Sequence, residues 1–132
     1  MGEHLRKQGW LPDVVLCSSA RRTCETAALL ELPPSVELAV EHDLYLADPD
    51  TVLHRIRAVD DRAATVMVIG HNPTMHEVER DLVGDGNKHA LRNLGEKYPT
   101  GALAVLDVDG VWPTLAPASG HLAAFVTPRE LG

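Results

Sequence analysis

Two short stretches of the sequence carry side chains that could bind a phosphoryl group. In the first, Arg21 and Arg22 follow closely after Ser18 and Ser19. A guanidinium group can hold two phosphate oxygens at once, and positive charge in the first turn of a helix opposes the helix dipole unless an anion binds there. In the second, His71 stands between an apolar run and an Asn-Pro pair. An imidazole brought close to guanidinium groups would suit phosphate chemistry.

Each stretch begins where a predicted strand ends and a predicted helix starts. Residues 13–17 and 65–69 are apolar runs typical of buried strands, and the second run indicates a strand covered on both faces. Residues 21–30 form a predicted helix that either preceding serine could cap, and Pro73 suits the first turn of another helix. Open α/β sheets bind ligands at the carboxyl ends of their strands, beside helix N-termini whose N–H groups favour anions. His71 and the arginines would therefore converge if these two strands are neighbours.

The rest of the sequence continues the alternation of helix and strand. Apolar spacing and turn residues predict helices at 3–8, 49–59, 74–83 and 87–96, and strands at 35–40, 102–108, 112–115 and 122–126. Elements of these lengths in this order predict an α/β fold: a three-layer sandwich around a mostly parallel central sheet with an antiparallel edge. Residues 1–132 are too few for two domains, so we expect a single one.

Composition excludes several classes of partner. Hydrophobic residues make up 45% and charged residues 23% of the chain, which is ordinary for a globular protein. A formal net charge of −7 argues against nucleic acid and anionic lipid as ligands, and no apolar run reaches the length of a membrane span. We therefore expect a cytoplasmic protein without a membrane or nucleic-acid partner, in which Cys17 and Cys24 are reduced thiols.

Several motifs of the chain resemble those of the histidine phosphatase superfamily, which has the phosphoglycerate-mutase-like fold. Ser18 to Thr26 looks like its Ser-x-x-x-Arg-(Ala/Thr)-x-x-Thr motif, and Gly70 to Pro73 looks like the motif around its second active-site histidine. Tyr98 to Leu106 and Phe125 to Arg129 are similar to late segments of the short phosphohistidine phosphatase branch. The motifs follow one another in the family's order along nearly the whole chain.

The resemblance implies roles for individual residues. It places the family's second phosphate-binding arginine on Arg22, with Arg21 beside it and Ser18 at the start of the same motif. It makes His71 a catalytic histidine that stabilises the transferring phosphoryl group, with Asn72 next to it. We expect no metal or cofactor.

The reaction implied by the resemblance passes through a covalent phosphohistidine. A neutral histidine nitrogen attacks phosphorus, and water then hydrolyses the intermediate. Asp43, in the loop after a predicted strand, is a candidate general acid, although an aspartate there also suits a turn. The implied partners are a phosphohistidine protein or a phosphorylated small molecule, and the sequence does not select between them.

The chain departs from the family pattern at the nucleophile. That histidine belongs to an Arg-His-Gly motif after the first strand, and no Arg-His pair occurs in this sequence. His4 does not replace it, because no strand precedes His4. We therefore expect an N-terminally incomplete domain that lacks the first strand and has little or no activity, or else a family member that has lost its nucleophile. In either case a phosphate-binding or phosphoprotein-binding module without catalysis remains an alternative.

Two other enzyme classes do not fit the sequence. A cysteine phosphatase with Cys17 as nucleophile would need an arginine six residues later, where the chain has Thr23. A zinc hydrolase with a His-Glu-x-x-His motif would need a second histidine four residues after His76, where the chain has Arg80.

Overall fold

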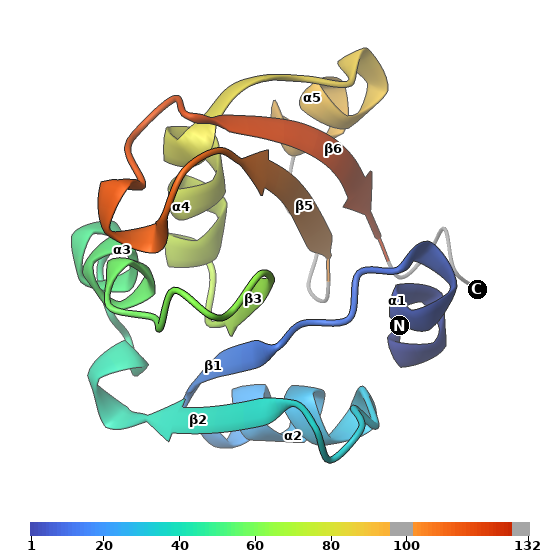
Figure 1. Ribbon diagram of the computed structural model, residues 1–132, viewed down its shortest axis with the longest axis vertical. Helices are drawn as coiled ribbons and strands as arrows, with labels where there is room; N and C mark the ends of the chain where they lie inside the picture. Colours follow the sequence, from blue (N-terminus) through green and yellow to red (C-terminus); the bar gives the residue numbers. More distant parts are fainter. Residues whose placement is uncertain (96–101, 128–132) are drawn as a thin grey trace.

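The computed structural model describes residues 1–95 and 102–127, in which helices and strands alternate along the chain (Figure 1). The strands are β1 (Val14–Ser18), β2 (Glu37–Glu41), β3 (Val66–Ile69), β4 (Val83–Gly86), β5 (Leu103–Val108) and β6 (Gly120–Val126). The helices are α1 (Gly2–Gln8), α2 (Arg21–Leu29), α3 (Pro49–Arg57), α4 (Thr74–Leu82) and α5 (Lys88–Gly95), with two short 3₁₀ helices, η1 (His42–Leu44) and η2 (Trp112–Thr114). The predicted α/β class is confirmed.

The first sheet is parallel throughout and has the order β2-β1-β3. Its register places Val15 beside Leu38 on one side and Met67 on the other. Successive side chains of β1 point to opposite faces, so Leu16 packs in the apolar cluster of α3 and α4, while Cys17 packs in a second cluster with residues of α2. Helices therefore cover both faces of this sheet, which gives the predicted three layers.

The second sheet has the order β4-β6-β5, and its edge strand β5 runs antiparallel to β6. Ala90 and Leu94 of α5 pack against Leu122 and Phe125 of β6. The antiparallel edge was predicted, but the described strands form two sheets rather than one central sheet. Val66 and Val68 of β3 pack against the cluster of α3 and α4, and Met67 and Ile69 pack against the cluster of α2, so both faces of this strand are covered as predicted, although its four residues are only half-buried. As an edge strand, β3 has a neighbour on one side alone.

Helix ends follow the sequence signals at α1 and α3 but not at α2, and Pro73 precedes α4 in the capping position rather than lying in its first turn as predicted. Helix α1 ends at Gly9, whose φ of 72° is left-handed and favours glycine. Helix α3 begins after Asp48, whose Oδ1 accepts a hydrogen bond from the backbone N–H of Thr51 at 2.8 Å. Helix α2 has Ala20 in the capping position and no side-chain cap, so the predicted serine cap is wrong. Ser18 Oγ instead accepts from the N–H of Ala20 at 3.2 Å, which stabilises the turn before the helix.

Residues 83–86 form β4, although the sequence predicted that their glycines only end the preceding helix. Strand β4 pairs in parallel with β6. A Cβ added to Gly84 would overlap the carbonyl oxygen of Ala118, so glycine allows this close approach of two backbones.

Residues 112–115, predicted as a strand, begin with η2 instead. Pro113 has no N–H to donate to a ladder, and the indole Nε1 of Trp112 donates to the carbonyl oxygen of Ala63 at 2.8 Å. The predicted helix end at Glu96 and the motif segments 98–101 and 128–129 lie outside the described residues. Across the described ranges, each helix is too short or too polar to cross a membrane.

Candidate functional site

The two stretches that carry the candidate residues lie at the same end of the first sheet, where its strands reach their carboxyl ends. Strand β1 pairs directly with β3, with Cys17 beside Ile69, and with β2, with Ser18 beside Glu41. Because all three strands are parallel, the segments that follow them emerge together, where the arrowhead of β2 points in Figure 1. The strand bearing His71 is thus a neighbour of the strand that leads to the arginines, as the sequence required for convergence.

The turn between β1 and α2 is held by its own side chains. Ser18 is 1% exposed. The hydroxyl of Thr23, which is also buried, lies 2.7 Å from the carbonyl oxygen of Ser18 and 2.8 Å from that of Ala20 and donates toward them. The Ser18 hydroxyl thus serves this turn, and Ser19, the next residue, is half-buried.

The two arginines of α2 have different surroundings. Arg21 Nε donates to Glu25 Oε1 at 2.9 Å, one turn along the helix, and its side chain is 93% exposed. Arg22 is also exposed, and within residues 1–95 and 102–127 it forms no ion pair. The guanidinium of Arg22 is therefore available to an anion without first breaking a salt bridge.

His71 is half-buried and contacts a hydroxyl that fixes its proton. Its Nε2 lies 3.4 Å from Thr74 Oγ1, and the same Oγ1 donates to the carbonyl oxygen of Ala47 at 2.8 Å. A hydroxyl has one hydrogen, and Thr74 uses it on that carbonyl. Toward His71 the hydroxyl can only accept, so in the neutral imidazole Nε2 carries the proton and Nδ1 keeps its lone pair. The sequence analysis missed Thr74, whose only signal was its place one turn after His71.

The structure brings His42, rather than Asp43, to the end of β1. His42 Nδ1 lies 3.4 Å from Ser19 Oγ, and its ring stacks on Tyr45 with centroids 6.0 Å apart. Asp43 is exposed in η1, and in the described part of the chain its carboxylate makes no hydrogen bond to a candidate residue. Asn72 is likewise exposed.

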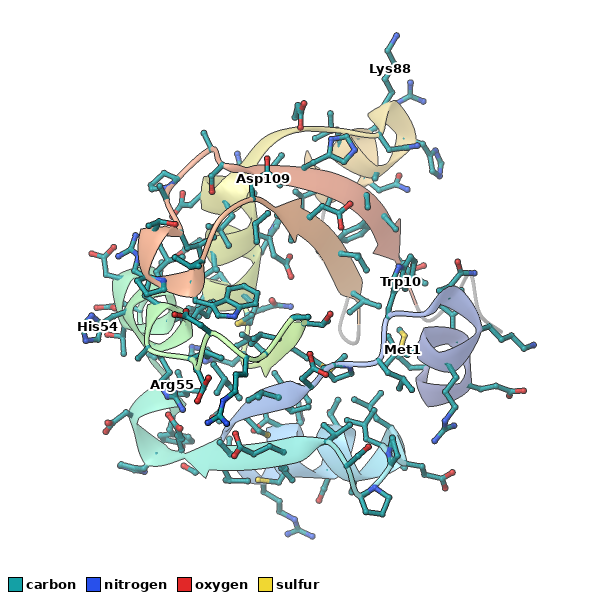
Figure 2. All side chains as sticks on the ribbon, in the orientation of Figure 1. Met1, Trp10, His54, Arg55, Lys88 and Asp109 are labelled. Carbon is teal, nitrogen blue, oxygen red and sulfur yellow. The ribbon has the colours of Figure 1, made fainter. Side chains whose placement is uncertain are left out.

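An ion pair anchors the end of β2 to α3. Arg55 Nε and Nη2 donate to Glu41 Oε1 and Oε2 at 2.6 and 2.7 Å, and Figure 2 shows Arg55 at the side of α3 that faces β2. These hydrogen bonds hold the pKa of the Glu41 carboxyl below its ordinary value and raise that of Arg55. The pair fixes Glu41, the residue directly before His42. His54, on the same helix, points outward from α3 (Figure 2).

Cys17 does not resemble a thiolate nucleophile. It is fully buried, and burial, followed by the neighbouring Cys24, raises the pKa of its thiol to about 11. Cysteine nucleophiles need the opposite shift. The rejection of a cysteine phosphatase therefore agrees with the structure.

A surface cavity of about 530 Å³ lies away from these residues, at the second sheet. Its lining includes Asp85, Asp107, Asp109 and His121. Figure 2 shows Asp109 on the side of the molecule opposite α2 and β2. An acidic lining repels phosphate. No three His, Cys, Asp or Glu side chains gather as a metal site in the described ranges.

Comparison with known proteins gives relatives that match along most of the chain. No protein-family model matches the chain. An uncharacterized protein of Mycobacterium leprae is 38% identical over 128 residues, which cover 92% of this chain and 78% of that protein. An uncharacterized protein of Mycobacterium tuberculosis is 35% identical over 129 residues, covering 92% of this chain and 80% of that protein.

Three solved structures share the fold over almost the whole chain. A protein proposed to be the phosphohistidine phosphatase SixA of Nakamurella multipartitia has a TM-score of 0.78 and 30% identity over 96% of this chain and 77% of its own. Its counterpart from Agrobacterium tumefaciens has a TM-score of 0.77 and 26% identity over 96% of this chain and 75% of its own. The protein histidine phosphatase SixA complexed with tungstate has a TM-score of 0.73 and 20% identity over 99% of this chain and 78% of its own, which shows the fold alone.

The three matched structures share the fold of this chain, and the one from Nakamurella multipartitia is 30% identical with 77% of its own length covered. The chain belongs to the histidine phosphatase superfamily, in its short phosphohistidine phosphatase branch.

Proposed function

We propose that this chain binds the phosphoryl group of a phosphohistidine protein or of a phosphate monoester, as the phosphate-binding part of a histidine phosphatase. The observation that carries the proposal is that β1 and β3 are neighbours, so that Arg22 and His71 follow adjacent strand ends. Arg22 has a guanidinium free of ion pairs in the described residues and sits in the first turn of α2, where backbone N–H groups also face an anion.

Each candidate residue has a distinct task in this proposal. Arg22 holds two phosphate oxygens, and the N–H groups of α2 hold a third. His71 stabilises the charge on the phosphoryl group from the side of β3, with Asn72 beside it. Arg21 adds positive charge, and Ser18 shapes the turn and positions the amides rather than contacting phosphate with its buried hydroxyl.

Covalent catalysis also needs a nucleophilic side chain. Phosphoryl transfer depends on positioning and electrostatic stabilisation, which Arg22 and His71 would supply, and on a nucleophile in line with the leaving group. The family motif carries its nucleophilic histidine in an Arg-His pair, and no Arg-His pair occurs in this sequence. Removal of a covalent nucleophile costs several orders of magnitude in rate, so the 132 residues are expected to bind phosphate and to turn over substrate very slowly or not at all.

A leaving group that departs as an alcohol or amine also needs a proton. Asp43 remains the candidate acid from the sequence, and its neighbour His42 is the residue of this segment that contacts the end of β1, through Ser19. Asp43→Asn and His42→Gln, made in a longer protein that contains these residues and turns over substrate, would identify the acid. The replacement that removes the acid should slow only substrates with poor leaving groups.

A second function has one observation in its favour, which is the absence of an Arg-His pair from the sequence. A phosphate-binding or phosphoprotein-binding module needs Arg22 and His71 but no nucleophile. Turnover of a phosphohistidine peptide that is lost on His71→Ala would contradict this second function.

Titration calorimetry with inorganic phosphate and tungstate tests the proposed site. Arg22→Ala should weaken binding by about tenfold to a hundredfold, the effect of losing a charge-assisted contact. Arg92→Ala is the matched control, because Arg92 is an exposed arginine on α5 and its replacement makes the same change in net charge. Equal losses in the two variants would reduce the interaction to general electrostatics and contradict the proposed site.

A further inference from the structure

Two thiols lie against one backbone carbonyl at the start of the phosphate-binding turn. Cys17 Sγ is 3.3 Å from the carbonyl oxygen of Ser18, and Cys24 Sγ is 3.6 Å from the same oxygen. Cys17 belongs to β1 and is fully buried, whereas Cys24 is in the first turns of α2 and half-buried. The two sulfurs are close enough for Cys24 to act directly on the titration of Cys17. Both cysteines are free.

The segment between the two cysteines is the turn that the proposed function uses. It runs from Ser18 to Thr23 and includes both Arg21 and Arg22. Hydroxyl contacts of Thr23 and Ser18 hold the turn, together with a hydrogen bond from the Ser19 N–H to the carbonyl oxygen of Glu41 at 3.2 Å. A covalent bond between the sulfurs would therefore close a small ring around the phosphate-binding residues.

We propose that Cys17 and Cys24 form an oxidative modification site, in which a peroxide joins them in a disulfide and thereby weakens phosphate binding by the turn they enclose. The part that concerns phosphate rests on the proposed function. Hydrogen peroxide oxidises the Cys24 thiol to a sulfenic acid and is reduced to water. The Cys17 thiol then loses its proton as its sulfur attacks the Cys24 sulfur, the S–O bond breaks, and the departing hydroxide takes up that proton and leaves as a second water.

The order of these steps follows from burial. Cys24 is the thiol that solvent reaches, so it meets the peroxide first. Cys17 has a pKa of about 11 because of its burial, so it stays a neutral thiol near pH 7. The raised pKa makes Cys17 a slow attacking thiol, so the second step should speed up as pH rises toward that pKa, while the contacts of both sulfurs with the Ser18 carbonyl oxygen keep the two partners together.

The disulfide would weaken phosphate binding because α2 must move. A disulfide bond is about 2.05 Å long, shorter than any contact between two thiols, and Cys17 is fixed inside the sheet. The first turns of α2 must shift toward β1 to close this distance, and they carry Arg22 and the N–H groups that would face phosphate. The Ser18 carbonyl also loses both of its thiol donors.

The cross-link can be detected without any phosphate assay. Trypsin cleaves after Arg21 and Arg22, so it separates the peptide of Cys17 from the peptide of Cys24 unless a disulfide joins them. After treatment of the whole chain with hydrogen peroxide, we expect a cross-linked peptide pair in mass spectrometry that disappears on reduction with dithiothreitol. Alkylated, separate peptides after the same treatment would overturn the proposal.

Phosphate titration of the reduced and oxidised chains tests the consequence. Oxidation should lower phosphate affinity by about tenfold, the loss expected for one charge-assisted contact, and dithiothreitol should restore it. Cys24→Ser, at the half-buried position, should bind phosphate like the reduced chain and stay unaffected by peroxide, which also controls for methionine oxidation. Cys24→Ala serves if the serine variant does not fold.

The two readouts separate this inference from the proposed function. A cross-linked chain whose phosphate affinity is unchanged would overturn the regulatory part. A reduced chain that does not bind phosphate would contradict the proposed function, while the cross-linked peptide would still report on the cysteine pair.

Discussion

His71 Nε2 and Thr74 Oγ1 lie 3.4 Å apart, and the Thr74 hydroxyl donates its hydrogen to the Ala47 carbonyl oxygen. The threonine is thus an acceptor toward the imidazole and selects the tautomer with the proton on Nε2. The carbonyl of Ala47, in the loop before α3, thereby determines which nitrogen of His71 presents a lone pair. The same arrangement links the β3 end of the site to the segment between η1 and α3.

Replacement of Thr74 by valine should remove the preference of His71 for the tautomer with the proton on Nε2. Thr74→Val keeps the shape of the side chain but removes both contacts of the hydroxyl, so the free energy of unfolding should fall by about 1 to 2 kcal/mol. Nitrogen-15 NMR of His71 at a pH where the ring is neutral should show more of the Nδ1–H tautomer. Thr74→Ser keeps the hydroxyl and should restore the tautomer. An unchanged tautomer in Thr74→Val would show that Thr74 has no such role.

The Glu41–Arg55 pair predicts a loss of stability in acid. The pKa of the Glu41 carboxyl is held below 4.5, mainly by hydrogen bonds from Arg55, so the pair contributes stability above the unfolded pKa, and the contribution is lost as pH falls through the folded pKa. Glu41→Gln should lower the free energy of unfolding by about 1 to 3 kcal/mol at pH 7, measured by urea denaturation. The difference from the unchanged chain should shrink below about pH 4.

An exposed carboxylate provides the control for that experiment. Glu31→Gln makes the same change of charge at a side chain that forms no ion pair within the described ranges, and it should leave stability at pH 7 nearly unchanged. If the difference between Glu41→Gln and the unchanged chain stayed constant from pH 7 to pH 3, the ion pair would not be the cause.

Two glycines of similar sequence context should respond in opposite directions to alanine. A Cβ on Gly84 would overlap the backbone carbonyl oxygen of Ala118, and backbone cannot rotate away as a side chain can. Gly84→Ala should therefore destabilise the chain by about 1 to 3 kcal/mol in thermal or urea unfolding. Among the described residues, no atom lies within 4 Å of a Cβ added to Gly95 at the end of α5, so Gly95→Ala should be neutral or stabilising by up to about 1 kcal/mol. A stable Gly84→Ala variant would argue against the close contact of β4 with Ala118.

Local patterns in the sequence were enough to predict most elements near the site. The apolar run before His71 and the Asp48-Pro49 start of α3 each depend on neighbours in sequence, and both were predicted in place. Strand β4 was not, because Val-Gly-Asp-Gly reads as a helix stop and becomes a strand only through pairing with β6, which lies more than thirty residues later.

Contacts across the fold explain what the site prediction missed. The sequence placed Asp43 in the site because its loop follows a strand, but the register of β1 and β2 brings His42 to Ser19. Thr74 gave no signal because its partner, the Ala47 carbonyl, is a backbone atom that any residue could supply. Such roles appear only when the strands and helices are in place.

The proposed convergence of Arg22 and His71 on one phosphoryl group predicts that their effects on binding are coupled. Arg22→Ala and His71→Ala should each lower phosphate affinity, but the double variant should lose less than the sum of the two free-energy changes. Once either residue is gone, the anion is held less closely, and the second residue has less contact to lose. The coupling measured by calorimetry should lie between about 0.5 and 3 kcal/mol, the range for side chains that share a partner. Pairing Arg22→Ala with His89→Ala, an exposed histidine at the start of α5, provides a cycle in which the changes should add. Additive effects of Arg22→Ala and His71→Ala, within about 0.3 kcal/mol, would place the two side chains at separate sites and remove the basis for a shared phosphate pocket.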